Sequence, residues 1–260
     1  MPQGTAMVEG FTLSEGRHAA GTRLPWHTHP GPTLCFVYAG TFTERFHRVT
    51  LECTPGTLKV TPADEPHSNR FGASHTEGLL VEADASHLDR LGPCGSLLAE
   101  RRSVRDAALA TMAWRLRSEL RRRDTAAPLA IEGLLLEILA VAARERELRL
   151  SGAPARWLMQ ARDVLHDPEW TGSLGEVAAA VGVHPVTLAR GFRKAYGRSV
   201  GCYLRLVRVT RAARQLADSD APLAEIALTA GFADQSHFSN VFRRETGFSP
   251  STFRRAIRGG

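Results

Sequence analysis

Residues 222–250 limit what this chain can fold into more than any other segment. We predict a short helix over 223–229, in which Ala227 stands four residues before Gly231. A close crossing of two helices needs a small side chain, and the turn between them needs a residue that accepts left-handed backbone. After Asp234, which can cap the next helix, three apolar residues follow the i, i+3, i+4 spacing of a buried stripe: Phe238, Val241 and Phe242. The segment therefore predicts a helix-turn-helix.

The opposite face of the second helix is polar and basic, with Gln235, Ser236, His237, Ser239, Asn240, Arg243 and Arg244. Amide and guanidinium groups pair with base edges when a recognition helix enters the DNA major groove. Phosphates take about half to two-thirds of protein–DNA hydrogen bonds, so Arg243 and Arg244 are expected on the backbone. His237 is equally compatible with a solvated surface position.

The same pattern occurs once before in the chain, as an internal repeat. Three of its residues reappear 49 or 50 positions later: Ala178 as Ala227, Gly182 as Gly231, and Phe192 as Phe242. Between the copies, residues 200–216 contain no helix breaker after Gly201. One long helix is therefore expected to hold two recognition helices at a fixed separation.

The net charge of +6 is unevenly distributed. Residues 1–150 hold 18 Lys and Arg against 18 Asp and Glu, whereas residues 151–260 hold 15 against 9. A neutral part is thus joined to a basic part, which is the charge distribution of a chain whose second part binds nucleic acid.

Location is predicted from what the sequence lacks. The four cysteines form no Cys-x-x-Cys pair, and the first residues do not resemble a secretory signal. The longest apolar stretch, 126–143, carries Pro128, Glu132 and Glu137, so it predicts an amphipathic helix and no membrane span. We expect a cytoplasmic protein that is nucleoid-associated when bound to DNA.

Residues 156–258 resemble the DNA-binding domain of the AraC/XylS family of bacterial transcription regulators. The resemblance is carried by the paired Ala-x-x-x-Gly turns and by segments 231–244, GFADQSHFSNVFRR, and 246–254, TGFSPSTFR. It implies two recognition helices in successive major grooves. By position, the first presents Val186, Thr187, Ala189 and Arg190, with Arg193 and Lys194 on phosphates, and the second presents the polar face given above. His184 stands where the family more often has a capping serine, so base reading by the first helix is expected to depend mainly on Thr187 and Arg190.

Residues 1–95 predict an all-β roll, because short runs rich in Val, Leu, Phe and Thr are broken by Gly or Pro at regular intervals. The expected strands are 33–38, 41–49, 56–61 and 77–82. Two segments, Gly21-x5-His27-x-His29 and Gly56-x5-Pro62-x4-His67, resemble the two motifs of the cupin superfamily. That resemblance implies a small jelly roll with an internal pocket.

The cupin resemblance also implies a metal site, with one departure. Metal-binding cupins use two histidines and a glutamate from the first motif and a histidine from the second. Here His27, His29 and His67 match, but Thr33 stands at the glutamate position. Three neutral imidazoles can still hold a divalent first-row transition metal. Alternatively, the histidines line an effector pocket without metal, together with Trp26, Phe36 and Tyr38.

Residues 96–152 predict a helical connector. We expect one helix over 103–123 and a second from Pro128, which carries more apolar surface than a single buried stripe needs. The resemblance implies a homodimer interface here; alternatively the helices pack only on each other and on the roll. Residues 153–260 form the expected third unit, preceded by a linker at 151–154 and opening with a helix over 156–166.

The sequence therefore predicts a two-domain α+β protein: a cupin-like jelly roll, a helical connector, and an all-α domain with two helix-turn-helix motifs. The predicted function is a transcription regulator that binds promoter DNA and responds to a small molecule or metal, more often as an activator that contacts RNA polymerase. The alternatives are a cupin oxygenase or isomerase fused to a DNA-binding domain, and a nucleoid-type protein without a sensor.

Overall fold

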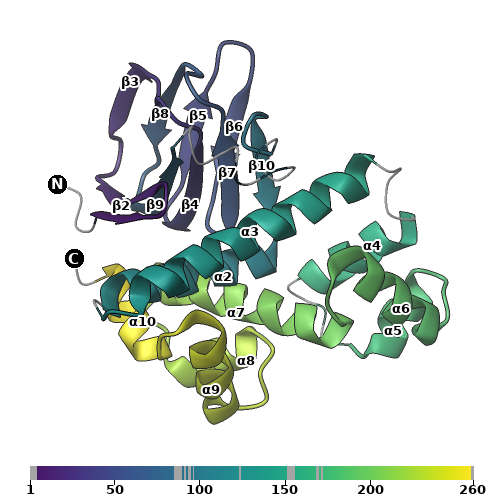
Figure 1. Ribbon diagram of the computed structural model, residues 1–260. Helices are drawn as coiled ribbons and strands as arrows, with labels where there is room; N and C mark the ends of the chain where they lie inside the picture. The colour runs from purple at the N-terminus through teal and green to yellow at the C-terminus, as the bar shows by residue number, and fades with distance from the viewer. Residues whose placement is uncertain are drawn as a thin grey trace.

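The computed structural model describes residues 5–84, 90, 92, 95, 97–122, 124–150, 156–167, 170 and 172–258. A β-roll of two sheets lies on one side of a helical layer (Figure 1), and two helix-turn-helix units lie on the other side. The chain is thus an α+β protein with its β part first.

Ten antiparallel strands within the described residues form the roll. The larger sheet has the order β1 (Thr5–Val8), β2 (Phe11–His18), β9 (Thr76–Ala83), β4 (Thr33–Ala39), β7 (Thr57–Thr61) and β10 (Arg102–Arg105). The smaller sheet has the order β3 (Arg23–His27), β8 (His67–Phe71), β5 (Phe42–Arg45) and β6 (Thr50–Cys53).

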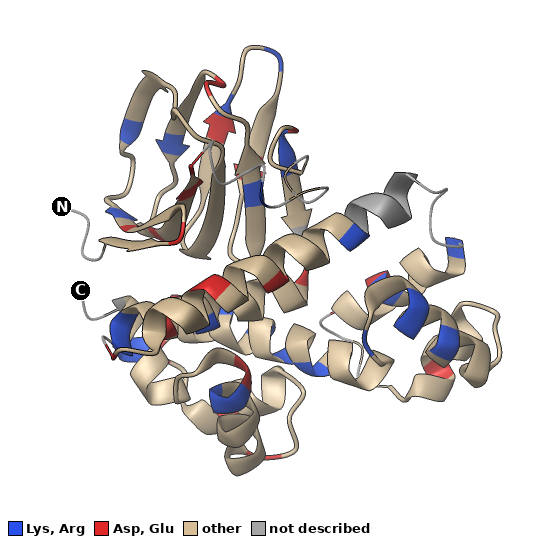
Figure 2. Cartoon of the chain, in the orientation of Figure 1, with Lys and Arg blue, Asp and Glu red and all other residues tan. Residues whose placement is uncertain are grey.

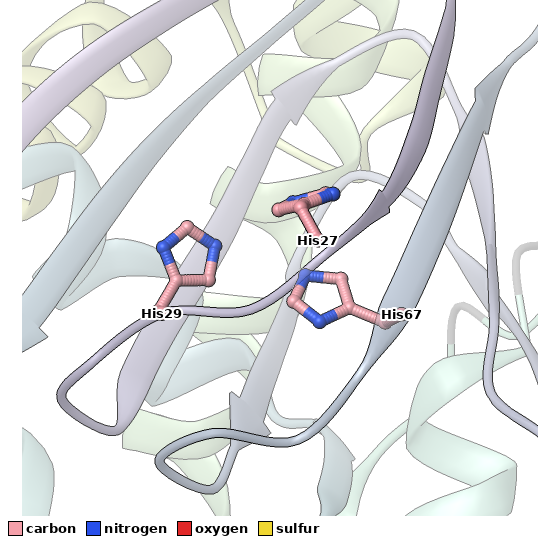
Figure 3. A group of neighbouring side chains, drawn as sticks. All are labelled: His27, His29 and His67. Carbon is pink, nitrogen blue, oxygen red and sulfur yellow. The ribbon is translucent and has the colours of Figure 1, made fainter.

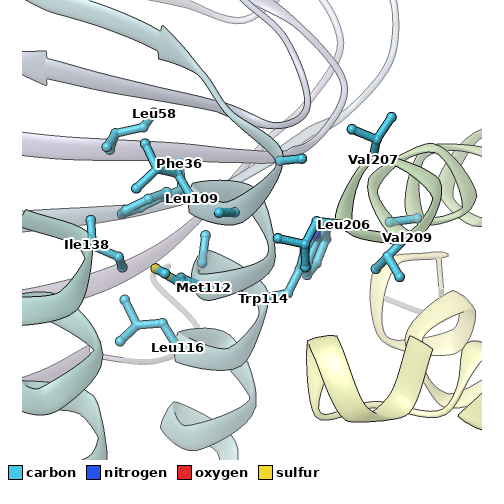
Figure 4. Packing of buried hydrophobic residues seen from close by; sticks show 14 of the residues in the cluster. Phe36, Leu58, Leu109, Met112, Trp114, Leu116, Ile138, Leu206, Val207 and Val209 are labelled. Carbon is cyan, nitrogen blue, oxygen red and sulfur yellow. The ribbon is translucent and has the colours of Figure 1, made fainter. Parts of the chain in front are cut away.

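The register of β4 and β7 decides which side chains face the inside of the roll. Phe36 lies opposite Leu58, and Cys35 lies opposite Lys59. Because side chains alternate along a strand, the first pair faces outward onto helix α2 (Ala107–Arg122) and the second pair faces the smaller sheet. Figure 4 shows Phe36 and Leu58 packed against the side chains of α2.

Two predicted boundaries were wrong. The helix expected over 103–123 begins only at Ala107, because Arg102–Arg105 pairs with β7 as the edge strand β10. Asp106 then caps α2, since its Oδ1 accepts hydrogen bonds from the amides of Ala108 at 2.7 Å and Leu109 at 3.1 Å. The run 41–49 is no single strand either: β5 ends at Arg45, and the chain turns before β6.

The connector helices lie between the roll and the DNA-binding part (Figure 1). Helix α3 (Ala127–Leu150) packs on α2. Helix α2 is in turn attached to the larger sheet by its buried Arg117. Arg117 Nε donates to Glu15 Oε1 at 2.7 Å, and its Nη2 donates to Glu77 Oε2 at 2.8 Å.

Among the described residues, no helix combines the length and apolar character that crossing a bilayer requires.

Seven helices follow in the described C-terminal part: α4 (Arg156–His166), α5 (Leu174–Ala180), α6 (Pro185–Tyr196), α7 (Val200–Asp218), α8 (Leu223–Thr229), α9 (Gln235–Thr246) and α10 (Pro250–Arg258). The predicted helices over 156–166, 200–216 and 223–229 are confirmed, with α7 two residues longer than expected. The predicted linker 151–154 lies outside the described residues.

Helix α2 also contacts the second helix-turn-helix. The Trp114 ring lies 4.4 Å from Tyr38 of β4 on one side and 4.2 Å from Phe253 of α10 on the other. Gly247, at the end of α9, lies so close to Ser118 of α2 that a Cβ there would be 2.6 Å from Ser118 Oγ. Its φ of +82° also favours glycine. The roll, α2 and the second helix-turn-helix therefore pack as one continuous unit.

Candidate DNA-reading surface and effector site

Helix α9 presents the polar face that its sequence predicts. Asp234 caps the helix, because its Oδ1 accepts from the His237 amide at 2.7 Å. The apolar stripe is buried, whereas six of the predicted DNA-contacting residues are exposed and Ser239 is partly buried; the exposed ones are Gln235, Ser236, His237, Asn240, Arg243 and Arg244. The ring of His237 also lies edge-on to Phe232 at 5.6 Å.

Helix α6 presents the equivalent face of the first unit. His184 occupies the capping position, and its Nδ1 accepts from the Val186 amide at 3.3 Å. The imidazole thus replaces the capping serine that the family more often has. Five predicted contact residues are exposed and Ala189 is partly buried; the exposed ones are Val186, Thr187, Arg190, Arg193 and Lys194.

Helix α7 separates the two recognition helices. It has 19 residues, which corresponds to about 28 Å at 1.5 Å per residue. Successive major grooves on one face of B-DNA lie about 34–36 Å apart, so a connector of this length is commensurate with two neighbouring grooves. Figure 2 shows Lys and Arg on both units and along α7.

The arginines of α7 do not all face away from the protein. Arg211 donates to the carbonyl of Asp167 at 3.1 Å, and Arg214 donates to the carbonyl of Pro55 at 3.2 Å. Pro55 lies in the β6–β7 turn, so Arg214 joins the DNA-binding part to the roll. Burial lowers the pKa of Arg208 and of Arg211, and the nearby Arg208 charge lowers the pKa of Arg211 further.

The three cupin-motif histidines come together inside one end of the roll (Figure 3). His27 ends β3, His67 begins the neighbouring β8, and their pairing places them opposite one another. His29 follows in the loop after β3. One ring nitrogen from each histidine lies within 4.8 Å of the others. The described residues thus offer three imidazoles at a common point, which is the donor set that divalent first-row metals accept.

Backbone carbonyls orient two of these rings. His27 Nδ1 lies 2.8 Å from the carbonyl of Pro25, and His67 Nδ1 lies 2.9 Å from that of Glu65. A carbonyl only accepts, so each Nδ1 carries a proton, which leaves Nε2 as the ring nitrogen available to a metal. Such hydrogen bonds fix the tautomer and orientation of metal-binding histidines.

Burial favours the neutral form of His29 and His67. Desolvation lowers the pKa of His29, and the neighbouring His67 and His27 lower it further. Desolvation also lowers the pKa of His67, although the Glu65 carbonyl and Glu44 act in the opposite direction. Metal ligation requires neutral imidazole, so the environment favours the ligating form.

Three residues behind His67 were missed by the sequence analysis. Glu44 of β5 is fully buried and forms an ion pair with the buried Lys59. Asn69 Nδ2 donates to Glu44 Oε1 at 3.3 Å, and His67 Nε2 lies 3.4 Å from the same oxygen. The alternation Phe42, Glu44, Phe46 within the predicted strand was a usable signal, because it places Glu44 on the face of two aromatic residues.

The predicted aromatic lining of an effector pocket is wrong for two of its members. Phe36 and Tyr38 face the helical layer, since β4 alternates, and the Tyr38 hydroxyl donates to the Ala113 carbonyl at 2.9 Å. Trp26 is 46% exposed and stacks on His47 at 5.1 Å, outside the histidine cluster. The buried aromatic residue that does lie beside the cluster is Phe46, whose ring is 5.8 Å from that of His67.

The fold, the exposed faces of α6 and α9 and the histidine cluster together define a class of protein. In this class a β-roll that carries potential metal or effector ligands is joined to tandem helix-turn-helix units. Comparison with protein families agrees. A model described as the AraC-like ligand binding domain matches residues 10–139, and a helix-turn-helix domain model matches residues 177–256. The first match covers half of the chain, and the chain belongs to the AraC family of transcription regulators.

Individual relatives match only part of this chain. An AraC-like transcription regulator of Streptomyces antibioticus is 32% identical over 146 residues, which cover 53% of this chain and 48% of that protein. The transcriptional activator RhaR of Salmonella arizonae is 42% identical over 67 residues, 26% of this chain and 24% of its own. The chain thus spans about half the length of the first relative and about a quarter of the second.

A solved structure of ToxT from Vibrio cholerae aligns with a TM-score of 0.40 at 12% identity, covering 96% of this chain and 100% of the ToxT chain.

Proposed function

We propose that this chain is a sequence-specific DNA-binding regulator that acts as an activator. Its activity would be controlled by a metal or small molecule bound in the roll. The observation that carries the proposal is the pair of exposed, polar and basic helix faces, α6 and α9, at the two ends of α7. Residues toward the start of each helix would read bases, and the four basic residues nearer its end would hold phosphates: Arg193, Lys194, Arg243 and Arg244.

Control would reach the DNA through α2. Arg117 and Tyr38 attach this helix to the larger sheet, and Trp114 and Ser118 contact the second helix-turn-helix. A ligand that shifts the roll therefore has a packed route to α9. In this proposal His27, His29 and His67 hold a divalent metal, which anchors an organic effector or is itself the signal.

We further propose that the chain forms a homodimer through α3. Three residues on one side of this helix are exposed although two of them are apolar: Leu129, Gly133 and Leu136. Their spacing of four and three residues matches a helix–helix contact stripe. Sedimentation should give a dimer for the wild type and a monomer for Leu129→Glu/Leu136→Glu, whereas an unchanged dimer would place the interface elsewhere.

The metalloenzyme alternative receives no support from the relatives, which are transcription regulators by name. An activating role is supported by the similarity to RhaR, which is named as a transcriptional activator. As an activator, this chain would have RNA polymerase as a partner.

The test of DNA reading uses the full chain and fragmented genomic DNA of its source. Sequencing of the retained fragments should give a small set upstream of coding regions, with a shared motif. The double variant Gln235→Ala/Asn240→Ala should retain fragments without that motif. Uniform retention of all fragments by the wild type would contradict sequence-specific regulation.

A further inference from the structure

The two recognition helices carry different chemistry at equivalent positions. Phe192 of α6 matches Phe242 of α9 at an offset of 50 residues, which also pairs their outward positions. In α9 these positions hold Gln235, Ser236, His237, Ser239 and Asn240, and in α6 they hold Pro185, Val186, Thr187, Ala189 and Arg190. Every one of the α9 side chains can hydrogen-bond a base edge, whereas in α6 only Thr187 and Arg190 can. The first recognition helix therefore meets DNA partly with apolar carbon.

The start of α6 exposes this carbon. Val186 is 50% exposed, and the neighbouring Pro185 is exposed as well. Proline has no backbone N–H, and the Val186 amide donates to Nδ1 of the capping His184 at 3.3 Å. At these two positions a DNA groove would therefore meet side-chain carbon.

The place of Val186 on the helix distinguishes it from an ordinary exposed valine, since single apolar residues are common on protein surfaces. Val186 and Arg190 are four residues apart and so lie on one face of α6. The helix packs on α4, α5 and α7, with Leu188 and Phe192 buried. Figure 1 shows α6 on the side of the molecule remote from the roll. Val186 thus lies on the face that would enter a groove, away from the contact between the roll and the DNA-binding part.

Thymine is the base that presents a methyl group in the major groove. The groups by which the other three bases are read there are hydrogen-bond donors and acceptors. A valine beside the C5-methyl group of thymine gains from the apolar area that both remove from water. Beside a donor or acceptor, the same valine would leave that polar group without a partner. The chemistry of Val186 therefore fits thymine.

We propose that Val186 is a specificity-determining residue that selects thymine through contact with its C5-methyl group. This inference rests on the DNA reading in the proposed function and names the base that the first recognition helix selects. Arg190 binds a nearby guanine, because a guanidinium pairs with O6 and N7 of that base. One helical turn rises about 5.4 Å and bases along a strand are about 3.4 Å apart, so the two bases are expected one or two base pairs apart.

The test uses the full chain and a synthetic duplex of a DNA fragment that it retains. Each thymine in turn is replaced by uracil, which lacks the C5-methyl group and keeps every hydrogen-bonding atom. At one thymine this exchange should weaken binding of the wild type roughly fourfold, the effect of one methyl group buried at the interface. The affinity of Val186→Ala should hardly respond to the same exchange, which would show that residue and methyl group are coupled.

Methylated cytosine gives the reverse test at the same position. With a C·G pair there, 5-methylcytosine should bind the wild type roughly fourfold more tightly than cytosine, and Val186→Ala should show little such preference. Val49→Ala is the matched control, because Val49 is 42% exposed in the turn between β5 and β6 of the roll. It should keep the preference of the wild type for the methylated base.

Two results would overturn the inference: equal affinity of the wild type for thymine and uracil at every position, or a loss on uracil that persists unchanged in Val186→Ala. In either case, preferential binding of the parent duplex over unrelated DNA would leave the DNA-binding regulator intact. If the wild type binds all duplexes alike, the proposed function and the assignment of Val186 fall together.

Discussion

Replacing Trp114 with alanine should separate the roll from the second helix-turn-helix. The ring is 5% exposed and lies between Tyr38 and Phe253, so the substitution removes one aromatic contact on each side of α2. Truncation of a buried Trp or Phe to alanine costs about 3–5 kcal/mol, and two aromatic pairs favour the upper half of that range. Because this cost falls on the contact between the two parts, we expect it to appear as lost cooperativity as well as lost stability.

The assay is urea unfolding followed by far-ultraviolet circular dichroism. The wild type should unfold in one transition, and Trp114→Ala should unfold at lower urea with two resolved transitions. Trp26→Ala is the matched control, since Trp26 is 46% exposed and contacts His47 away from α2. It should change the free energy of unfolding by less than about 1 kcal/mol. Equal destabilisation by both substitutions would refute the role given to α2.

Three further predictions concern the reading helices and the roll. Asn240→Ala should lose about 1–3 kcal/mol at individual base pairs, whereas Arg243→Ala should weaken all sequences alike; competition binding with single-base variants of the site distinguishes the two. Asp234→Ala should cost about 1 kcal/mol of stability because it removes the cap of α9, and thermal melting would contradict this if the midpoint did not move. Burial lowers the pKa of His18 from its ordinary 6.5, so the unfolded chain binds a proton first and stability should fall as pH decreases below that value. His18→Phe should make unfolding less dependent on pH between about 7 and 5, and an unchanged dependence would exclude this contribution.

The DNA-binding part could be predicted from sequence because its constraints are local. Ala227, Gly231 and Asp234 each perform a task that depends on neighbours within a few residues: close crossing, a left-handed turn with φ +90°, and capping. The repeat then supplied the second copy. In sequence, His184 only departs from the capping serine that the family more often has, and the contact of its Nδ1 with the Val186 amide identifies the imidazole as a cap.

The roll was harder to predict because its constraints are long-range. Arg102–Arg105 reads as the start of a helix until β7, far earlier in the chain, is seen to pair with it, with Lys59 opposite Ser103. The local sequence pattern of 102–105 does not show which distant strand it pairs with. Likewise, whether Phe36 faces the pocket or α2 depends on the register of β4 against β7. The histidines were predictable from motif spacing, whereas Glu44 comes to lie beside His67 only through the pairing of β5 with β8.

In the proposed complex, α6 and α9 read two neighbouring major grooves from the ends of α7. Hydroxyl-radical footprinting of the full chain on a retained genomic fragment tests this directly. We expect two protected blocks on one face of the duplex, separated by about one helical turn, roughly 10 base pairs, and Asn240→Ala should weaken protection of one block more than the other. A single protected block, or two blocks on opposite faces of the duplex, would contradict it.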